Sequence, residues 1–193
     1  MVLNQSLIRV TGPANEPVTV AEARDHLELL ASDTHHNAKI TRTIQVARER
    51  VENDTSCVLI SQTYKLRLRD FPTESEPIQL GIRPVSAISS LTYYDDSNVQ
   101  QTLATSVYGL DARQQLIYLK YDQEWPSYTA QHNGIEVTMT VGYGTAANVP
   151  AIFKQLILLQ VGMYFEDRGD DYRRRYNNAY DDLLVTAMRR TYP

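Results

Sequence analysis

One stretch, from Val149 to Gly169, constrains the fold most strongly, because its apolar side chains recur at helical spacing on two adjacent faces. Pro150 suits the first turn of a helix, where its missing N–H is not needed, and Gly169 suits a left-handed helix end. The first stripe consists of Ile152, Leu156, Leu159 and Met163, and the second of Phe153, Ile157, Val161 and Phe165. A helix with two such stripes belongs in the middle of a core or a subunit interface. Polar residues interrupt the apolar run, so it is too short for a membrane span.

Two helical patterns precede this stretch. The first begins at Thr19, which has Glu22 three residues later, the spacing of a capping box. Its predicted buried face consists of Val20, Ala23, Leu27 and Leu30. The second runs from about His36 to Asn53, and a final helix is expected from Asp170 onward. The segment before Thr19 is expected to be an extended arm whose apolar residues lie on a neighbour.

Between Val58 and Gly142 the apolar spacing changes to two, which indicates about seven short β-strands. The clearest alternation ends the block, where Ile135, Val137, Met139 and Val141 are separated by polar residues. We therefore predict an α+β fold. Residues 1–57 and 147–193 form a discontinuous helical bundle domain, and residues 58–146 form an inserted antiparallel domain like a β-sandwich or barrel.

Composition excludes several classes of protein. The chain has 193 residues with a formal net charge of −4, which argues against a protein that coats nucleic acid through a basic face. Cys57 is the only cysteine, so no disulfide forms within the chain, and no Cys/His cluster suggests zinc. No signal peptide is apparent, and we expect the protein to be made in a reducing cytoplasm.

Four motifs invite a catalytic interpretation, and none supports it. They are His35-His36, Asp95-Asp96, the group Asp122, Glu124 and Trp125, and Gly142-Tyr143-Gly144. Adjacent histidines on a helix point about 100° apart, and a hairpin turn explains the aspartate pair. The glycine motif lacks the lysine of a phosphate-binding loop. We therefore predict a protein that is not an enzyme, with no catalytic residues, no cofactor and no metal.

The C-terminal segment combines arginine with tyrosine, which is abundant in this chain at 13 residues against 3 phenylalanines. Tyrosine is favoured at interfaces because it packs an apolar ring and keeps one end wet. We predict a partner-binding surface there, consisting of Arg173, Arg174, Arg175, Tyr176, Tyr180, Arg189, Arg190 and Tyr192. A solvated face balanced by nearby aspartates is the alternative.

The chain resembles the phage head–tail connector (adaptor) proteins, the group that includes the gp8 protein of phage phiE125 and the gp6-like connectors. The resemblance covers nearly the whole chain and rests on the order and spacing of several short motifs. They are Val18-Thr19-Val20-Ala21-Glu22-Ala23, Ala47-Arg48-Glu49-Arg50-Val51-Glu52, Leu59-Ile60-Ser61-Gln62-Thr63-Tyr64, Leu91-Thr92-Tyr93-Tyr94-Asp95, Val141-Gly142-Tyr143-Gly144, Val149-Pro150 and Tyr164-Phe165-Glu166-Asp167-Arg168. The chain departs from the family pattern at residues 53–57 and between Asp33 and Lys39.

The resemblance implies a structural protein of the virion neck. Such proteins form a ring, usually a dodecamer, that is assembled in the host cytoplasm and docked on the portal protein. The ring extends the DNA channel and provides the platform for a stopper or tail-terminator protein. An acidic channel wall suits passage of DNA without specific binding, and no membrane contact is implied.

A closed ring needs two different patches on each subunit. We predict that Leu7, Ile8, Ile157, Val161 and Phe165 contribute to the subunit interface, and that the C-terminal surface contacts the portal. Two other functions stay open: a stopper or tail-completion protein in the same conduit, and a carbohydrate- or receptor-binding module on the β-domain. An exposed aromatic platform around Trp125 and Tyr128 would favour the second of these.

Overall fold

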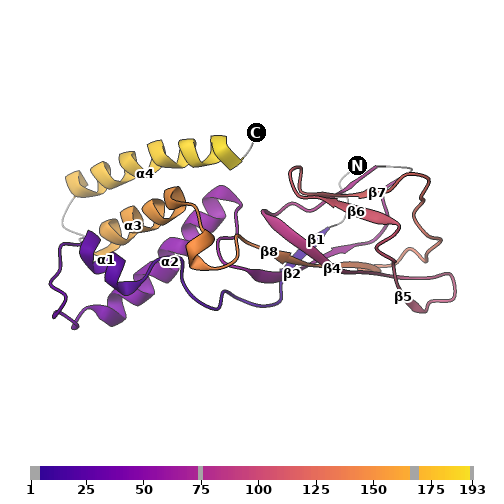
Figure 1. Ribbon diagram of the computed structural model, residues 1–193, viewed down its shortest axis with the longest axis horizontal. Helices are drawn as coiled ribbons and strands as arrows, with labels where there is room; N and C mark the ends of the chain where they lie inside the picture. Colours follow the sequence, from indigo (N-terminus) through magenta and orange to yellow (C-terminus); the bar gives the residue numbers. More distant parts are fainter. Residues whose placement is uncertain (1–4, 74–75, 166–169, 192–193) are drawn as a thin grey trace. The chain divides into compact units, whose positions relative to one another are not determined.

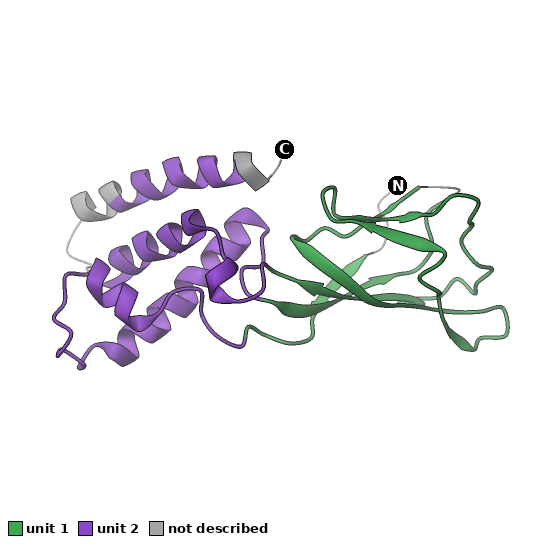
Figure 2. Ribbon diagram, viewed as in Figure 1, with its two compact units in different colours: residues 1–13, 61–142 green, residues 14–60, 143–193 purple. Residues whose placement is uncertain are grey.

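The computed structural model describes the backbone of residues 5–73, 76–165 and 170–191, and their side chains except those of 170–175 and 189–191. The chain divides into two compact units, each described separately below (Figure 2). The β unit comprises residues 1–13 and 61–142, and the helical unit comprises residues 14–60 and 143–193. The α+β class with antiparallel sheets is confirmed, and the described strands form no closed barrel.

The helical unit is built around α3 (Ala151–Phe165), the stretch that the sequence singles out (Figure 1). Helices α2 (Asn37–Thr55) and α4 (Asp170–Thr191) pack against α3, and α1 (Val20–His26) contacts α2 and α3. A short 3₁₀ turn, η1 (Ala146–Asn148), precedes α3. The core combines residues from all four α-helices, among them Ala23, Ile40, Ile44, Ala47, Val51, Phe153, Leu156, Ile157, Val161, Tyr180 and Ala187.

Helix α1 begins as predicted but is shorter than expected. The Thr19 hydroxyl accepts from the Glu22 N–H, and the Glu22 carboxylate accepts from the Thr19 N–H, so the capping box is confirmed. The helix ends at His26 because Glu28 has a left-handed φ of 55°. Leu30, which we predicted on the buried face, is therefore 75% exposed.

The described strands of the β unit form two antiparallel sheets. The larger has the order β1 (Ser6–Arg9), β2 (Gln62–Leu68), β8 (Ile135–Val141), β4 (Val85–Tyr94) and β5 (Gln100–Thr102). The smaller has the order β3 (Ile78–Gln79), β7 (Leu116–Leu119) and β6 (Tyr108–Asp111). Every second residue of β8 is buried, as the alternation predicts.

The N-terminal arm is a strand of the β unit. Ser6 to Arg9 pair antiparallel with Arg67 to Tyr64 of β2. The predicted placement of residues 1–57 in the helical domain therefore differs from the structure, in which residues 1–13 group with the β unit. The strand forms because the free edge of β2 offers unpaired N–H and C=O groups that a short extended segment can satisfy.

Candidate functional site

The helical unit carries an open groove of about 220 Å³ between α2 and α3. Its lining consists of Lys39, Arg42, Thr43, Val46 and Tyr164. Val46 is 50% exposed and Tyr164 is 36% exposed, so the groove offers an apolar floor to solvent. Lys39 and Arg42 are exposed beside it, which gives the groove a positively charged rim.

Contacts within the unit hold the rim of this groove in place. The Lys39 ammonium donates to the Phe165 carbonyl at 3.2 Å and lies 4.4 Å from the centre of the Phe165 ring. The Arg50 guanidinium, one turn beyond Val46, donates to the Tyr164 hydroxyl at 3.4 Å. No sequence motif marks this groove, although the spacing of residues 39, 42, 46 and 50 places their side chains on one side of a helix.

Tyr180 fastens α4 to α2. Its hydroxyl donates to the Asp54 carboxylate at 2.8 Å, and the Arg50 guanidinium lies 5.3 Å from the centre of its ring. Burial and the neighbouring Asp54 carboxylate raise the pKa of the Tyr180 hydroxyl well above its ordinary value. The side chain is 1% exposed. Within the subunit Tyr180 is therefore a core residue rather than part of an open binding surface.

The rest of the predicted C-terminal surface is only partly described. Tyr176 is half-buried, and its ring lies so close to Gly162 that a Cβ on Gly162 would stand 2.7 Å from it. Glycine at this position lets α4 approach α3 closely. The side chains of Arg173, Arg174, Arg175, Arg189 and Arg190, and the whole of Tyr192, lie outside the described residues.

The residues predicted at the subunit interface separate into two groups. Ile157 and Val161 are fully buried in the core of the helical unit, so the second stripe of α3 is covered by its own subunit. Phe165 is half-buried, with its ring edge-on to the His36 ring at 5.3 Å. Leu7 and Ile8 are each 40% exposed on the edge strand β1. An interface role stays a prediction, for which Leu7 and Ile8 offer the accessible apolar surface.

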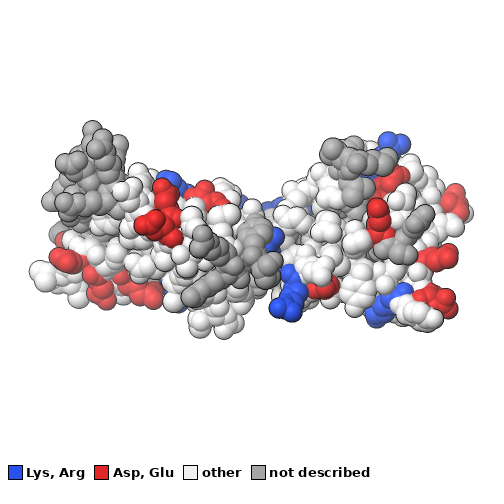
Figure 3. All heavy atoms as spheres, turned by 90° about the horizontal axis from the view of Figure 1, so that it is seen from above, with Lys and Arg blue, Asp and Glu red and all other residues white. Residues whose placement is uncertain are grey.

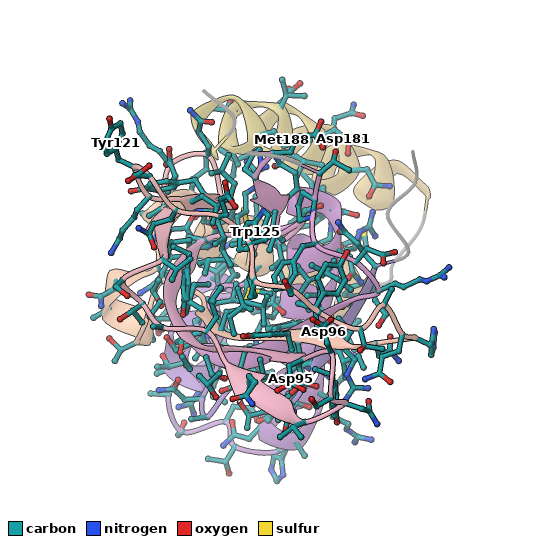
Figure 4. The ribbon with its side chains drawn as sticks, turned by 90° about the vertical axis from the view of Figure 1, so that its right-hand side faces the viewer. Asp95, Asp96, Tyr121, Trp125, Asp181 and Met188 are labelled. Carbon is teal, nitrogen blue, oxygen red and sulfur yellow. The ribbon has the colours of Figure 1, made fainter. Side chains whose placement is uncertain are left out.

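The aspartate pair forms a turn. The Asp95 carboxylate accepts hydrogen bonds from the Ser97 and Val99 N–H groups at 2.9 Å and from the Gln101 side chain at 2.8 Å. The Val99 N–H contributes most to lowering the pKa of Asp95 below its ordinary value. These bonds close the β4–β5 hairpin, as the turn interpretation predicts. Figure 4 labels Asp95 and Asp96 near this hairpin.

The aromatic residues near Trp125 pack on one another. The Trp125 ring stacks on Phe71 at 4.8 Å, and Tyr128 meets Phe71 edge-on at 5.1 Å. Trp125 and Tyr128 are both half-buried, whereas Tyr121, at the outer edge of Figure 4, is 99% exposed. Because Phe71 occupies a face of the Trp125 ring, this cluster does not offer the open aromatic platform that sugar binding would favour.

Metal and membrane sites are not apparent in the described part of the chain. Within residues 5–73, 76–165 and 170–191 no group of three or more His, Cys, Asp and Glu side chains is arranged to hold a metal ion. Among the described helices, none combines the length and apolar character needed to cross a bilayer.

The fold is similar to that of chains in the neck and virion of gene transfer agent particles. One similar chain comes from the neck of an empty gene transfer agent (GTA) particle, with a TM-score of 0.70 and 25% identity, covering 86% of each chain. Another comes from the virion of a native GTA particle, with a TM-score of 0.70, 24% identity and coverage of 85% and 86%. A third, from a native neck reconstructed with C12 symmetry, has a TM-score of 0.69, 23% identity and coverage of 89% and 94%. No protein-family model and no curated protein sequence matches the chain.

Proposed function

We propose that this chain is a structural protein of the neck of a phage-like virion, where copies of it form a ring between the portal and the tail. The observation that carries the proposal is the likeness to the GTA neck chain, which spans 86% of both chains. The likeness therefore includes most of both units rather than one common domain.

The proposed ring extends the DNA channel and serves as the platform for a stopper or tail-terminator protein. The similar chains belong to necks reconstructed with C6 and C12 symmetry, which supports assembly of this chain into a symmetric ring, with a dodecamer as the proposed copy number. The net charge of −4 supports passage of DNA rather than binding, because a wall of like charge repels phosphate. The role is structural rather than catalytic.

Helix α4 and the tail that follows it, from Arg173 to Pro193, are the proposed portal contact. Since Tyr180 is buried, the proposal now rests on Arg189, Arg190 and Tyr192 together with the arginines at 173–175. Arginine pairs with carboxylates in a geometry that favours specific protein contacts.

Deleting the gene for this chain from the genome that encodes the phage-like particle tests the proposed function. We expect heads that contain DNA but carry no tail, and addition of purified wild-type protein should restore tail attachment in electron micrographs. Arg189→Glu/Arg190→Glu should fail to restore attachment, while the exposed Arg113→Glu in the β unit should restore it. Normal tails without the gene would contradict the proposed function. Failure at a later step, with the protein's ring already on the portal, would instead favour a stopper or tail-completion role.

A further inference from the structure

The groove between α2 and α3 has the chemistry of a docking surface for an apolar side chain flanked by carboxylates. Val46 and Tyr164 provide exposed apolar surface, and Lys39 and Arg42 provide positive charge beside it. An apolar contact surrounded by complementary charge is the usual arrangement of a specific protein interface.

The opposite side of α2 faces the start of the helical unit. The Arg48 guanidinium points to this side, where it pairs with the Glu16 carboxylate at 2.8 Å in the segment that leads into α1. Residues 46 and 48 are two apart on one helix, so their side chains point about 200° apart around its axis. The groove and the segment before α1 therefore lie on opposite flanks of α2.

Helix α1 and the turn after it carry charges opposite to those of the groove. The side chains of Glu22, Asp25 and Glu28 are exposed, and Leu30 is 75% exposed beyond them. Figure 3 shows acidic side chains gathered along one edge of the helical unit. The left-handed turn at Glu28 and the bond from the Asp33 N–H to the Leu30 carbonyl fix the backbone on both sides of Leu30. We call the surface formed by Asp25, Glu28 and Leu30 the acidic flank.

We propose that the acidic flank of one copy docks in the groove of the next copy, with Leu30 on Val46 and Tyr164, and with Asp25 and Glu28 beside Lys39 and Arg42. The inference rests on the proposed function and deepens it by assigning the contact between neighbouring subunits. A second copy is the occupant that the charges favour, because one chain carries both an exposed acidic patch and a groove with a positively charged rim. An interface between two different patches is head-to-tail, the type that closes into a ring when the rotation between subunits permits it.

Two charge-reversed variants test this arrangement. The flank variant is Asp25→Lys/Glu28→Lys, and the groove variant is Lys39→Glu/Arg42→Glu. In either one alone the two patches carry like charges, so we expect the dissociation constant for self-association to rise at least about tenfold. A mixture of the two should associate again, because each patch then meets an opposite charge on the other variant. Light scattering gives the mass of the oligomers, and negative-stain images show whether they are rings.

Controls separate docking from folding and from total charge. Asp96→Lys/Glu124→Lys and Arg69→Glu/Arg113→Glu make the same charge changes at exposed positions of the β unit and should associate like wild type. Because Lys39 contacts Phe165, the single variant Arg42→Glu repeats the test without changing that contact. Thermal unfolding followed by circular dichroism verifies that each variant is folded.

The outcomes distinguish the inference from the proposed function. Association of the mixture, with neither variant associating alone, supports the docking surfaces. Rings of each separate variant as stable as those of wild type would overturn the docking surfaces and leave the neck function standing. A wild-type chain that stays monomeric at high concentration would also overturn the inference. Electron microscopy of assembled necks then tests the function independently, since a neck without this chain would contradict the function itself.

Discussion

The buried polar side chains of the two units have different kinds of partners. In the helical unit, two buried polar side chains bond to side chains of other segments: Arg48 to Glu16, and Tyr180 to Asp54. In the β unit, the buried Gln115 side chain instead accepts from the Val85 backbone N–H at 2.5 Å. The charged residues of its large sheet form a partly exposed row in which Lys65 and Arg67 both pair with Glu136.

This difference follows from the backbone. A helix satisfies its own N–H and C=O groups, so side chains must determine how it sits against its neighbours. A sheet fixes the register of its strands through backbone hydrogen bonds and the alternation of buried residues. Changes to buried side chains should therefore affect the helical unit most, and changes to the charged row of the sheet should have small effects.

The largest effect is expected from the centre of α3. Ile157→Ala removes a fully buried side chain and leaves a cavity, which should lower the free energy of unfolding by about 3 kcal/mol. Urea denaturation followed by far-UV circular dichroism measures the change. Val46→Ala, at a position that is 50% exposed, is the matched control and should change stability by less than about 0.5 kcal/mol. An Ile157→Ala protein that keeps wild-type stability but loses ring assembly would show that Ile157 is an interface residue after all.

A similar loss of stability is expected when the buried, positively charged Arg48 is replaced. Arg48 is 4% exposed, and its guanidinium lies 2.7 Å from the Glu52 carboxylate, which is itself 12% exposed. The two acidic partners outweigh the effect of burial and raise the pKa of Arg48, so the residue stays charged. Arg48→Met leaves Glu52 without its cation and should cost roughly 3 kcal/mol in urea denaturation. The exposed Arg42→Met should be nearly neutral, and equal stabilities of the two variants would contradict the comparison.

Replacing Gln160 should raise the stability of the helical unit rather than lower it. Its side chain is 1% exposed, and neither amide atom has a hydrogen-bond partner in the described part of the chain. Burying an unpaired amide is costly, so Gln160→Leu should stabilise the helical unit by about 1 kcal/mol. Thermal unfolding should show a higher midpoint for this variant, with the exposed Gln155→Leu as the control. A lower midpoint would contradict the prediction and indicate that the Gln160 amide is hydrogen-bonded in the folded protein.

The smallest effect is expected in the charged row of the β unit. Burial alone would raise the pKa of Glu136, but hydrogen bonds from Lys65 and Arg67 lower it below its ordinary value of 4.5. Because the pKa in the folded state is lowered, these ion pairs stabilise the fold above about pH 4.5 and lose that effect as the pH falls through the folded value. These side chains are partly exposed, so the contribution is at most about 1 kcal/mol.

Urea midpoints at neutral and acidic pH measure this contribution. Glu136→Gln should lower the midpoint at neutral pH and reduce its dependence on pH, whereas the exposed Glu124→Gln should leave both unchanged. An unchanged pH profile for Glu136→Gln would show that the row does not stabilise the sheet.

Local patterns predicted much of this fold. The capping box at Thr19 and the alternation along β8 are signals contained within a few residues, and both were correct. The pairing of β1 with β2 joins Leu7 to Leu66, which no local pattern specifies. The burial of Arg48 likewise depends on Glu16, which is distant in sequence. Leu30 was misplaced because glutamate at position 28 gives no signal of a left-handed turn.

The candidate surfaces were harder to predict than the fold. Tyr180 and Ile157 were expected at contacts with other subunits because tyrosine and apolar stripes suit interfaces as well as cores, and the spacing of residues on one helix does not distinguish the two. Packing against α2 and α4 decides the question in favour of the core. The groove at Lys39 and Val46 depends on where Tyr164 of α3 lies beside α2, which is a property of tertiary packing.

Electron microscopy of the neck of the assembled particle tests the central claim most directly. A reconstruction should show copies of this chain as a closed ring between the portal and the tail, with the two-unit fold fitting each repeat. A neck whose density leaves no place for this fold, or a particle that carries the chain outside the neck, would contradict the account.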